Sequence, residues 1–340
     1  MAVIMQDGAL AREQNATRGI VLIVVAMFCI TINDMLIKQL SAAYPLHQMV
    51  FVRSVIGICF SFLILQYEGG LRLLHTTQPW LHIVRGLCLV AANMLFFAAL
   101  AVIPLADATA LFFAAPLFIT LLSIPFLGES VGPRRVAAVA VGFLGVLVML
   151  RPGGLSDASA PDRWILILPV CAAFAYACVQ ILTRRLGVSS RASAMAIYIQ
   201  ALFIIISLGF WLVAGDGRFV EGVENKSAVF LLRAWTWPST ADWPLFLALG
   251  FLSAIVTYAL SQAYRSADAA AIAPFEYVAL PMAIFWGWAV FGHWPDLWVM
   301  SGISVFGLSG IYVFVRERER ARGVRPPARG LGAVRLPTSP

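Results

Sequence analysis

The sequence predicts an all-α membrane protein with ten transmembrane helices in two inverted five-helix repeats. Hydrophobic residues make up 61% of the 340 residues and charged residues only 12%, against ~45–50% and ~25% in soluble domains. Apolar runs of about twenty residues recur from end to end, and such runs are long enough to cross a bilayer core. This composition excludes a soluble enzyme, a DNA-binding module and a secreted disulfide scaffold.

The apolar runs, bounded by turn residues and charges, define the expected membrane spans. The first run is not a cleavable signal, because Asp34 and Lys38 follow its apolar stretch and no small-residue cleavage site is present. In chain order, the ten spans are 19–40, 46–66, 81–102, 106–127, 133–151, 164–184, 192–213, 241–264, 268–291 and 297–316.

Three motifs recur in the same order in both halves of the chain. They are Phe28-x5-Asp34-x3-Lys38-x-Leu40 with Phe174-x5-Gln180-x3-Arg184-x-Leu186, Ala106-Asp107-Ala108 with Ala267-Asp268-Ala269, and Gly142-x2-Gly145 with Gly307-x2-Gly310. Each repeat would hold five spans, and because five is odd, the second repeat enters the membrane upside down. Inverted repeats of this kind open a central site alternately to the two sides of a membrane.

The repeat divides the chain into five parts. We expect a cytoplasmic N-terminal tail (1–18), a first repeat (19–151), a linker (152–163), a second repeat (164–316) and a basic cytoplasmic tail (317–340). The spacing of the glycine motifs predicts that the fifth and tenth spans pack closely against each other, away from a central site, because small residues let helices approach.

The distribution of basic residues predicts the orientation. With both termini in the cytoplasm, seventeen Lys and Arg residues lie on that side and six on the other, and this asymmetry is typical of cytoplasmic loops. Arg85, Arg134, Arg135, Arg184 and Arg185 are counted there as topology determinants. Loop 214–240 then lies outside. The arginine-rich tail supplies most of the net charge of +7 and faces anionic lipid rather than nucleic acid.

Cofactor, metal and enzymatic signatures are absent from the sequence. The five cysteines lie in apolar runs without a Cys-x-x-Cys pattern, and the four histidines lack metal-ligand spacing. No hydrolase or nucleotide-binding motif is present. We therefore expect no cofactor, no metal and no enzymatic activity.

Ionisable residues inside the spans are few, and such residues are functional candidates because their burial is costly. Asp34 and Arg53 lie at a similar depth in the first two spans, where they would either pair merely to join the helices or contact a solute. Glu276 lies in the other half of the membrane with no basic residue expected at its depth. Burial favours its uncharged form, so Glu276 is the candidate for proton coupling.

The repeat extends this set to ten candidate binding residues. The counterpart of Asp34 is Gln180 and that of Arg53 falls at Ile199–Gln200, so Gln180, Gln200 and Glu276 should cluster in the cytoplasmic half of a central cavity. Further hydrogen-bonding candidates lie between the two clusters: Asn93, Tyr176, Tyr258, Gln262 and Tyr277. For each of these the alternative is a polar contact between neighbouring helices.

Motifs of the fourth and ninth spans resemble those of the EamA family of the drug/metabolite transporter superfamily. They are Ala115-Pro116-Leu117 with Leu127-Gly128-Glu129, and Ala273-Pro274-Phe275-Glu276-Tyr277. The resemblance covers about 19–316. It implies a bacterial inner-membrane carrier, most similar to members that take up riboflavin or S-adenosylmethionine or export amino acids. One departure is His293, where the family often has a Glu.

The candidate residues indicate a neutral or zwitterionic, partly planar solute, since aromatic walls stack on flat rings. Riboflavin is the first candidate, with aromatic amino acids and S-adenosylmethionine as alternatives. A membrane enzyme or scaffold is the alternative outside transport. The expected partners are the solute and membrane lipid. A homodimer, the direction of transport and the coupling ion stay open.

Overall fold

The structure, a computed structural model, describes residues 2–150, 163–187, 189–223 and 225–305. Within these ranges the secondary structure is helical and contains no strand. The predicted all-α class is therefore confirmed. The expected linker 152–163 lies almost wholly outside the described residues, and so does the basic tail 317–340.

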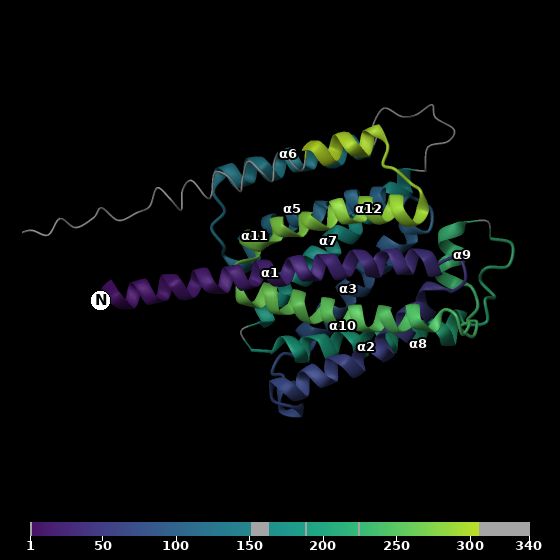
Figure 1. The fold of residues 1–340 in the computed structure, drawn as a ribbon, viewed down its shortest axis with the longest axis horizontal. Coiled ribbons are helices and arrows are strands. Elements are labelled where there is room, and N and C mark those ends of the chain that lie inside the picture. Colours follow the sequence, from purple (N-terminus) through teal and green to yellow (C-terminus); the bar gives the residue numbers. More distant parts are fainter. Residues whose placement is uncertain (1, 151–162, 188, 224, 306–340) are drawn as a thin grey trace, which may run out of the picture.

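The helices lie side by side in a bundle (Figure 1). In chain order, they are α1 (Ala2–Leu40), α2 (Leu46–Glu68), η1 (Leu71–Leu74), α3 (Pro79–Leu100), α4 (Leu105–Phe112), α5 (Ala114–Leu127), α6 (Pro133–Met149), α7 (Arg163–Leu186), α8 (Ala192–Ala214), α9 (Lys226–Leu232), α10 (Trp243–Ser266), α11 (Ala269–Ile272), η2 (Ala273–Val278) and α12 (Ala279–Phe291).

Eight helical segments among the described residues are long and apolar enough to cross a membrane. They correspond to eight of the ten expected spans. The fifth expected span is α6, which is shorter at 17 residues. Of the tenth, 297–316, only the helical residues 297–305 are described. Ten helices therefore stays a prediction. The segment 1–18 is expected to be a tail, but from Ala2 onward it belongs to helix α1.

The fourth and ninth spans are both broken near a proline. Pro116 lacks the N–H that would bond the carbonyl of Phe112, and α4 ends at Phe112. In the ninth span, Pro274 lies where α11 gives way to the 3₁₀ turn η2. The broken segments place side chains toward the centre of the bundle.

The major helix pairs are α1 with α10, α3 with α7, and α2 with α8. Helix α6 and the helix at 297–305 lie together at one edge of the bundle, at the top of Figure 1. A Cβ on Gly302 would lie 2.9 Å from the carbonyl oxygen of Gly145. The predicted close packing of the fifth and tenth spans is thus confirmed for the described residues, whereas Gly307 and Gly310 lie outside them. Gly142 instead faces Leu117 of α5.

The segment between α8 and α10 covers one end of the bundle, at the right of Figure 1. Ser227 Oγ donates to the carbonyl of Ala98 (2.6 Å), and Arg233 donates to the carbonyls of Ser41 (2.7 Å) and Ala42 (2.9 Å). The side-chain amide of Gln48 and the backbone of Thr236 bond each other in both directions. These contacts close the end of the bundle where α1 ends and α2 begins.

Candidate functional site

A central cavity is lined by residues of α1, α2, α3, α4, α5, α7, α8, α10, η2 and α12. Its empty space, the part open to solvent included, is about 1150 Å³. Its aromatic walls come from Phe96, Phe97, Phe112, Phe113 and Phe203. The polar residues that line it are Asn33, Asp34, Arg53, Arg85, Asn93, Tyr176, Gln180 and Glu276, with hydroxyl groups of Thr31, Thr109, Ser253, Thr257 and Ser261.

Arg53 is held at one end of the cavity by two amide oxygens. Its Nη1 donates to Asn33 (3.3 Å) and its Nη2 to Asn93 (3.1 Å). The guanidinium also lies 5.1 Å from the ring centroid of Phe203, within the range of cation–π attraction. Helices α1, α2, α3 and α8 thus meet at this side chain.

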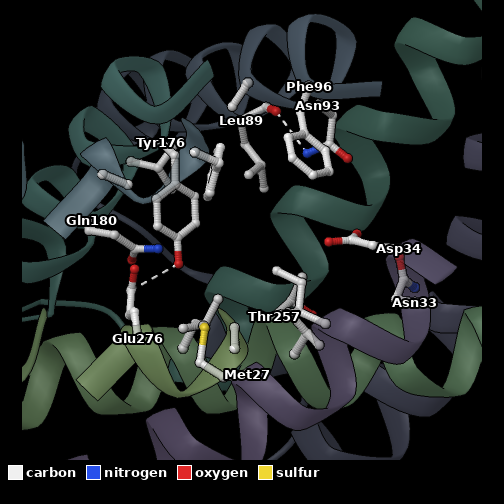
Figure 2. A pocket seen from close by; sticks show the side chains of 18 of the residues that line it. Met27, Asn33, Asp34, Leu89, Asn93, Phe96, Tyr176, Gln180, Thr257 and Glu276 are labelled. Atoms are coloured by element: carbon white, nitrogen blue, oxygen red, sulfur yellow. Dashed lines mark hydrogen bonds between the residues drawn. The ribbon is translucent and has the colours of Figure 1, made fainter. Parts of the chain in front are cut away.

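Asp34 lies beside this cluster with its carboxylate toward the cavity (Figure 2). The charges of Asp34 and Arg53 attract each other. However, no described residue forms an ion pair with Asp34 within 4.0 Å, and Arg53 directs its hydrogen bonds to the two asparagines instead. The carboxylate is half-buried and lines the cavity, where a solute can reach it.

Glu276 lies at the opposite end of the cavity, in η2 (Figure 2). Its Oε1 accepts hydrogen bonds from the hydroxyls of Tyr264 (2.6 Å) and Tyr176 (3.1 Å). The side chain is 3% exposed. Gln180 lies beside Glu276 and Tyr176 in the same view. Two hydroxyl donors stabilise a carboxyl group here in either protonation state, because each can bond a charged or an uncharged oxygen.

Arg85 lines the cavity as well, which corrects its interpretation as a topology determinant at the membrane surface. It is 3% exposed. Its Nε donates to Thr183 Oγ1 (2.6 Å), its Nη1 to the carbonyl of Met195 (3.3 Å) and its Nη2 to Ser261 Oγ (2.8 Å). The side chain reaches from the second turn of α3 into the bundle, a direction that the sequence pattern does not reveal.

The structure brings six of the ten candidate residues to the cavity: Asp34, Arg53, Asn93, Tyr176, Gln180 and Glu276. The other four lie elsewhere. Gln200 is buried between helices, where it donates to Ser253, and Tyr258 donates to Glu68 at 2.6 Å. Gln262 bonds Ser266 and Arg265. Tyr277 packs against Phe113, with ring centroids 5.5 Å apart.

Two polar residues that bond the cavity-lining candidates were missed: Asn33, which binds Arg53, and Tyr264, which binds Glu276. Asn33 directly precedes Asp34 in the chain, and adjacent residues of a helix normally point in different directions. Tyr264 lies on a helix with several other aromatic residues. Neither has a sequence signal that separates it from polar residues between helices.

The motif residue Glu129 has a structural contact outside the cavity. Its Oε1 accepts a hydrogen bond from the backbone N–H of Ala269 (2.9 Å). It thus satisfies a free N–H at the start of α11, and it joins the end of the fourth span to the start of the ninth.

Comparisons with known proteins agree with this architecture. Residues 17–151 match the model of the EamA-like transporter family. A riboflavin transporter of Rhizobium johnstonii is 29% identical over 321 residues, which cover 94% of this chain and 98% of that protein. An S-adenosylmethionine uptake transporter of Rickettsia prowazekii is 24% identical, over 88% of this chain and 94% of its own length.

A pseudopaline exporter of Pseudomonas aeruginosa is 29% identical, over 84% of this chain and 91% of its own length. One solved crystal structure superposes with a TM-score of 0.63 at 17% identity, over 91% of this chain and 99% of that chain, and so shares the fold. The resemblance to the EamA family is confirmed. The apolar helices and these relatives support a multi-pass membrane protein with a role in transport.

Proposed function

We propose that the chain is a secondary transporter that moves a small metabolite by alternating access between two inverted repeats. The central cavity carries this proposal, because it lies among the helices that span the membrane and joins aromatic walls to a few buried polar groups. Transporters of this kind bind their solute near the middle of the membrane, where the repeats meet.

The helix packing supports two equivalent halves. Exchanging the halves converts α1 to α7, α2 to α8 and α3 to α10. The close pair α1–α10 then becomes α7–α3, which is also a close pair, and α2–α8 becomes itself. The fourth and ninth spans, which correspond to each other, are both broken near a proline.

Riboflavin is the first solute to test, with S-adenosylmethionine and aromatic amino acids as the alternatives. Its flat ring suits the phenylalanine-lined walls of the cavity. A relative that covers nearly the whole chain is named a riboflavin transporter. Glu276 is the proposed coupling residue, since it is the acidic group at the end of the cavity opposite Asp34.

The experiment is solute accumulation in proteoliposomes that contain the purified chain. We expect labelled riboflavin to accumulate, or to exchange with riboflavin inside, and to be recovered unchanged. Protein-free liposomes are the control. Accumulation of S-adenosylmethionine or an aromatic amino acid instead would identify that compound, and not riboflavin, as the transported solute. Conversion of the solute, or no flux of any of the three, would contradict transport as proposed.

We further propose that the protein lies in a bacterial inner membrane with both termini in the cytoplasm, as the basic residues indicate. Reporter fusions at Gly217 and Gly330 test this orientation. Gly217 lies in the segment between α8 and α10. The two fusions should report opposite compartments, and the same compartment for both would rule out a ten-span chain.

A further inference from the structure

Arg85 is a buried cation without a counter-charge in the part of the chain that the structure describes. Its three hydrogen-bond partners, Thr183, Met195 and Ser261, contribute two hydroxyls and one carbonyl. No described carboxylate lies within 4.0 Å of it. Of the two carboxyl groups that line the cavity, Asp34 lies beside Arg53, and Glu276 is bonded to two tyrosine hydroxyls.

The other arginine of the cavity differs in this respect. Arg53 is also buried, but the charge of Asp34 attracts it. Charges in a membrane interior are costly and normally pair with one another or with backbone carbonyls. Arg85 receives one carbonyl and no opposite charge. Of the two buried arginine charges in the cavity, the charge of Arg85 is thus the less compensated.

Arg85 also has hydrogen-bonding capacity left. A guanidinium has five N–H donors, and the described contacts use one on each of its three nitrogens. Its side chain and that of Ser261 both line the cavity. A planar fork with free donors at a cavity wall matches the oxygen pair of a carboxylate or a phosphate.

We infer that Arg85 binds an anionic group of the transported solute, a carboxylate or a phosphate, at the end of the cavity where α3 begins. This inference rests on the proposed transport through the cavity and names the class of solute. It ranks a solute with an acidic group above its neutral counterpart, and thus the phosphate ester of riboflavin above riboflavin itself.

The half-buried carboxylate of Asp34 complements this site at the other end. Asn93, which binds Arg53 beside Asp34, is eight residues beyond Arg85 on α3, or ~12 Å at 1.5 Å per residue. A solute that uses both sites carries its acidic group at Arg85 and a cationic or N–H donor group at Asp34. The two polar groups of such a solute lie ~12 Å apart.

The first test measures thermal unfolding of the purified full chain in detergent, with sodium benzoate or neutral benzamide at matched sodium concentration. Benzoate should give the same rise in unfolding temperature as benzamide at about one tenth of the concentration. This preference should vanish in Arg85→Gln, fall but persist in Arg85→Lys, and stay unchanged in Arg72→Gln, since Arg72 is exposed outside the cavity.

Equal effects of benzoate and benzamide, or an undiminished preference in Arg85→Gln, would overturn the inference. Leu89→Trp provides a second variant in case Arg85→Gln does not fold. Leu89 lines the cavity one turn beyond Arg85, so a larger side chain there should block the anion while the guanidinium stays. An unchanged benzoate preference in Leu89→Trp would place the anion elsewhere.

The second test compares binding of riboflavin and riboflavin 5′-phosphate by the fluorescence of the flavin. The ester should bind at least tenfold more tightly to the wild type, and the two should bind within twofold of each other in Arg85→Gln. Transport without any benzoate or phosphate preference would refute the inference and leave the proposed function intact. An Arg85-dependent preference without solute flux would support anion binding at Arg85 and contradict the proposed transport.

Discussion

Arg184 Nη2 lies 3.0 Å from Asp268 Oδ1, and this ion pair joins two of the three motifs that recur in the second half of the chain. The same guanidinium donates to the carbonyl of Arg265 (3.0 Å). In the first half, the counterpart of Arg184 is Lys38. Its ammonium donates to the carbonyls of Leu100 (2.9 Å) and Ile103 (2.8 Å).

The Lys38 ammonium is also attracted by Asp107, the counterpart of Asp268. In each half, the basic residue near the end of the first helix therefore contacts the end of the third helix. It also interacts with the aspartate at the start of the broken fourth helix. We predict that an experimental structure superposes 19–151 on 164–316 by rotation about an axis in the membrane plane, with Asp34 over Gln180. Superposition about the membrane normal, or none, would refute the inverted repeat.

Glu276→Gln should reduce solute transport roughly tenfold or more, which equals about 1.4 kcal/mol of activation free energy. The amide oxygen can still accept from Tyr176 and Tyr264, but the side chain can no longer exchange a proton. The protein should therefore remain folded and inserted. Initial rates in proteoliposomes at pH 6 and pH 8, at equal protein levels, measure the effect.

Tyr264→Phe is the matched control, because it removes one hydrogen bond to Glu276 and leaves the carboxyl group. It should retain the pH dependence of transport, which Glu276→Gln should lose. Wild-type rates of the Gln variant at both pH values would show that Glu276 is structural. Asp34 would then be the next candidate for coupling.

Gly302→Val should lower the free energy of unfolding by ~1–3 kcal/mol, the usual cost of overpacking, without changing the affinity for solute. A Cβ at this position would lie 2.9 Å from a backbone oxygen of Gly145, so the two helices must separate. Neither residue lines the cavity. Thermal unfolding and the KM for transport are the measurements, and a changed KM with unchanged stability would contradict this packing role.

The closed end of the bundle should lose stability in acid, because the carboxyl group of Asp242 becomes protonated. Hydrogen bonds from the hydroxyls of Tyr44 (2.7 Å) and Ser239 (2.7 Å) hold the pKa of its carboxyl below the ordinary value. A lowered pKa contributes stability above the unfolded value of ~3.9, and this contribution is lost as pH falls through the folded value.

Asp242→Asn should therefore be less stable than the wild type at pH 7, and the difference should shrink below about pH 4. Unfolding temperatures across this range measure it. Tyr44→Phe, which removes one of the two donors, should show a smaller difference in the same direction. A difference that does not vary with pH would exclude this role of the carboxylate.

The apolar runs and motifs were sufficient to predict much of the molecule. Eight spans and the contact between the Gly145 region and residues 297–305 follow from runs of about twenty apolar residues and from paired glycines. Both signals depend only on residues near one another in the sequence, so they can be identified without knowledge of the fold. Asp34, Arg53 and Glu276 were identified in the same way, because a charge inside an apolar run is rare.

The sequence by itself determined the all-helical membrane class, most span boundaries and the rare charges within the spans, because bilayer thickness and the cost of burying charge act on each segment separately. Only the tertiary structure decided which polar side chains meet in the cavity. Arg85 lies near a span end and yet points inward, whereas Gln200 and Tyr258 lie deep in their spans and bond other helices. The direction of a side chain depends on how its helix rotates against its neighbours, and that rotation is set by the packing of the whole bundle.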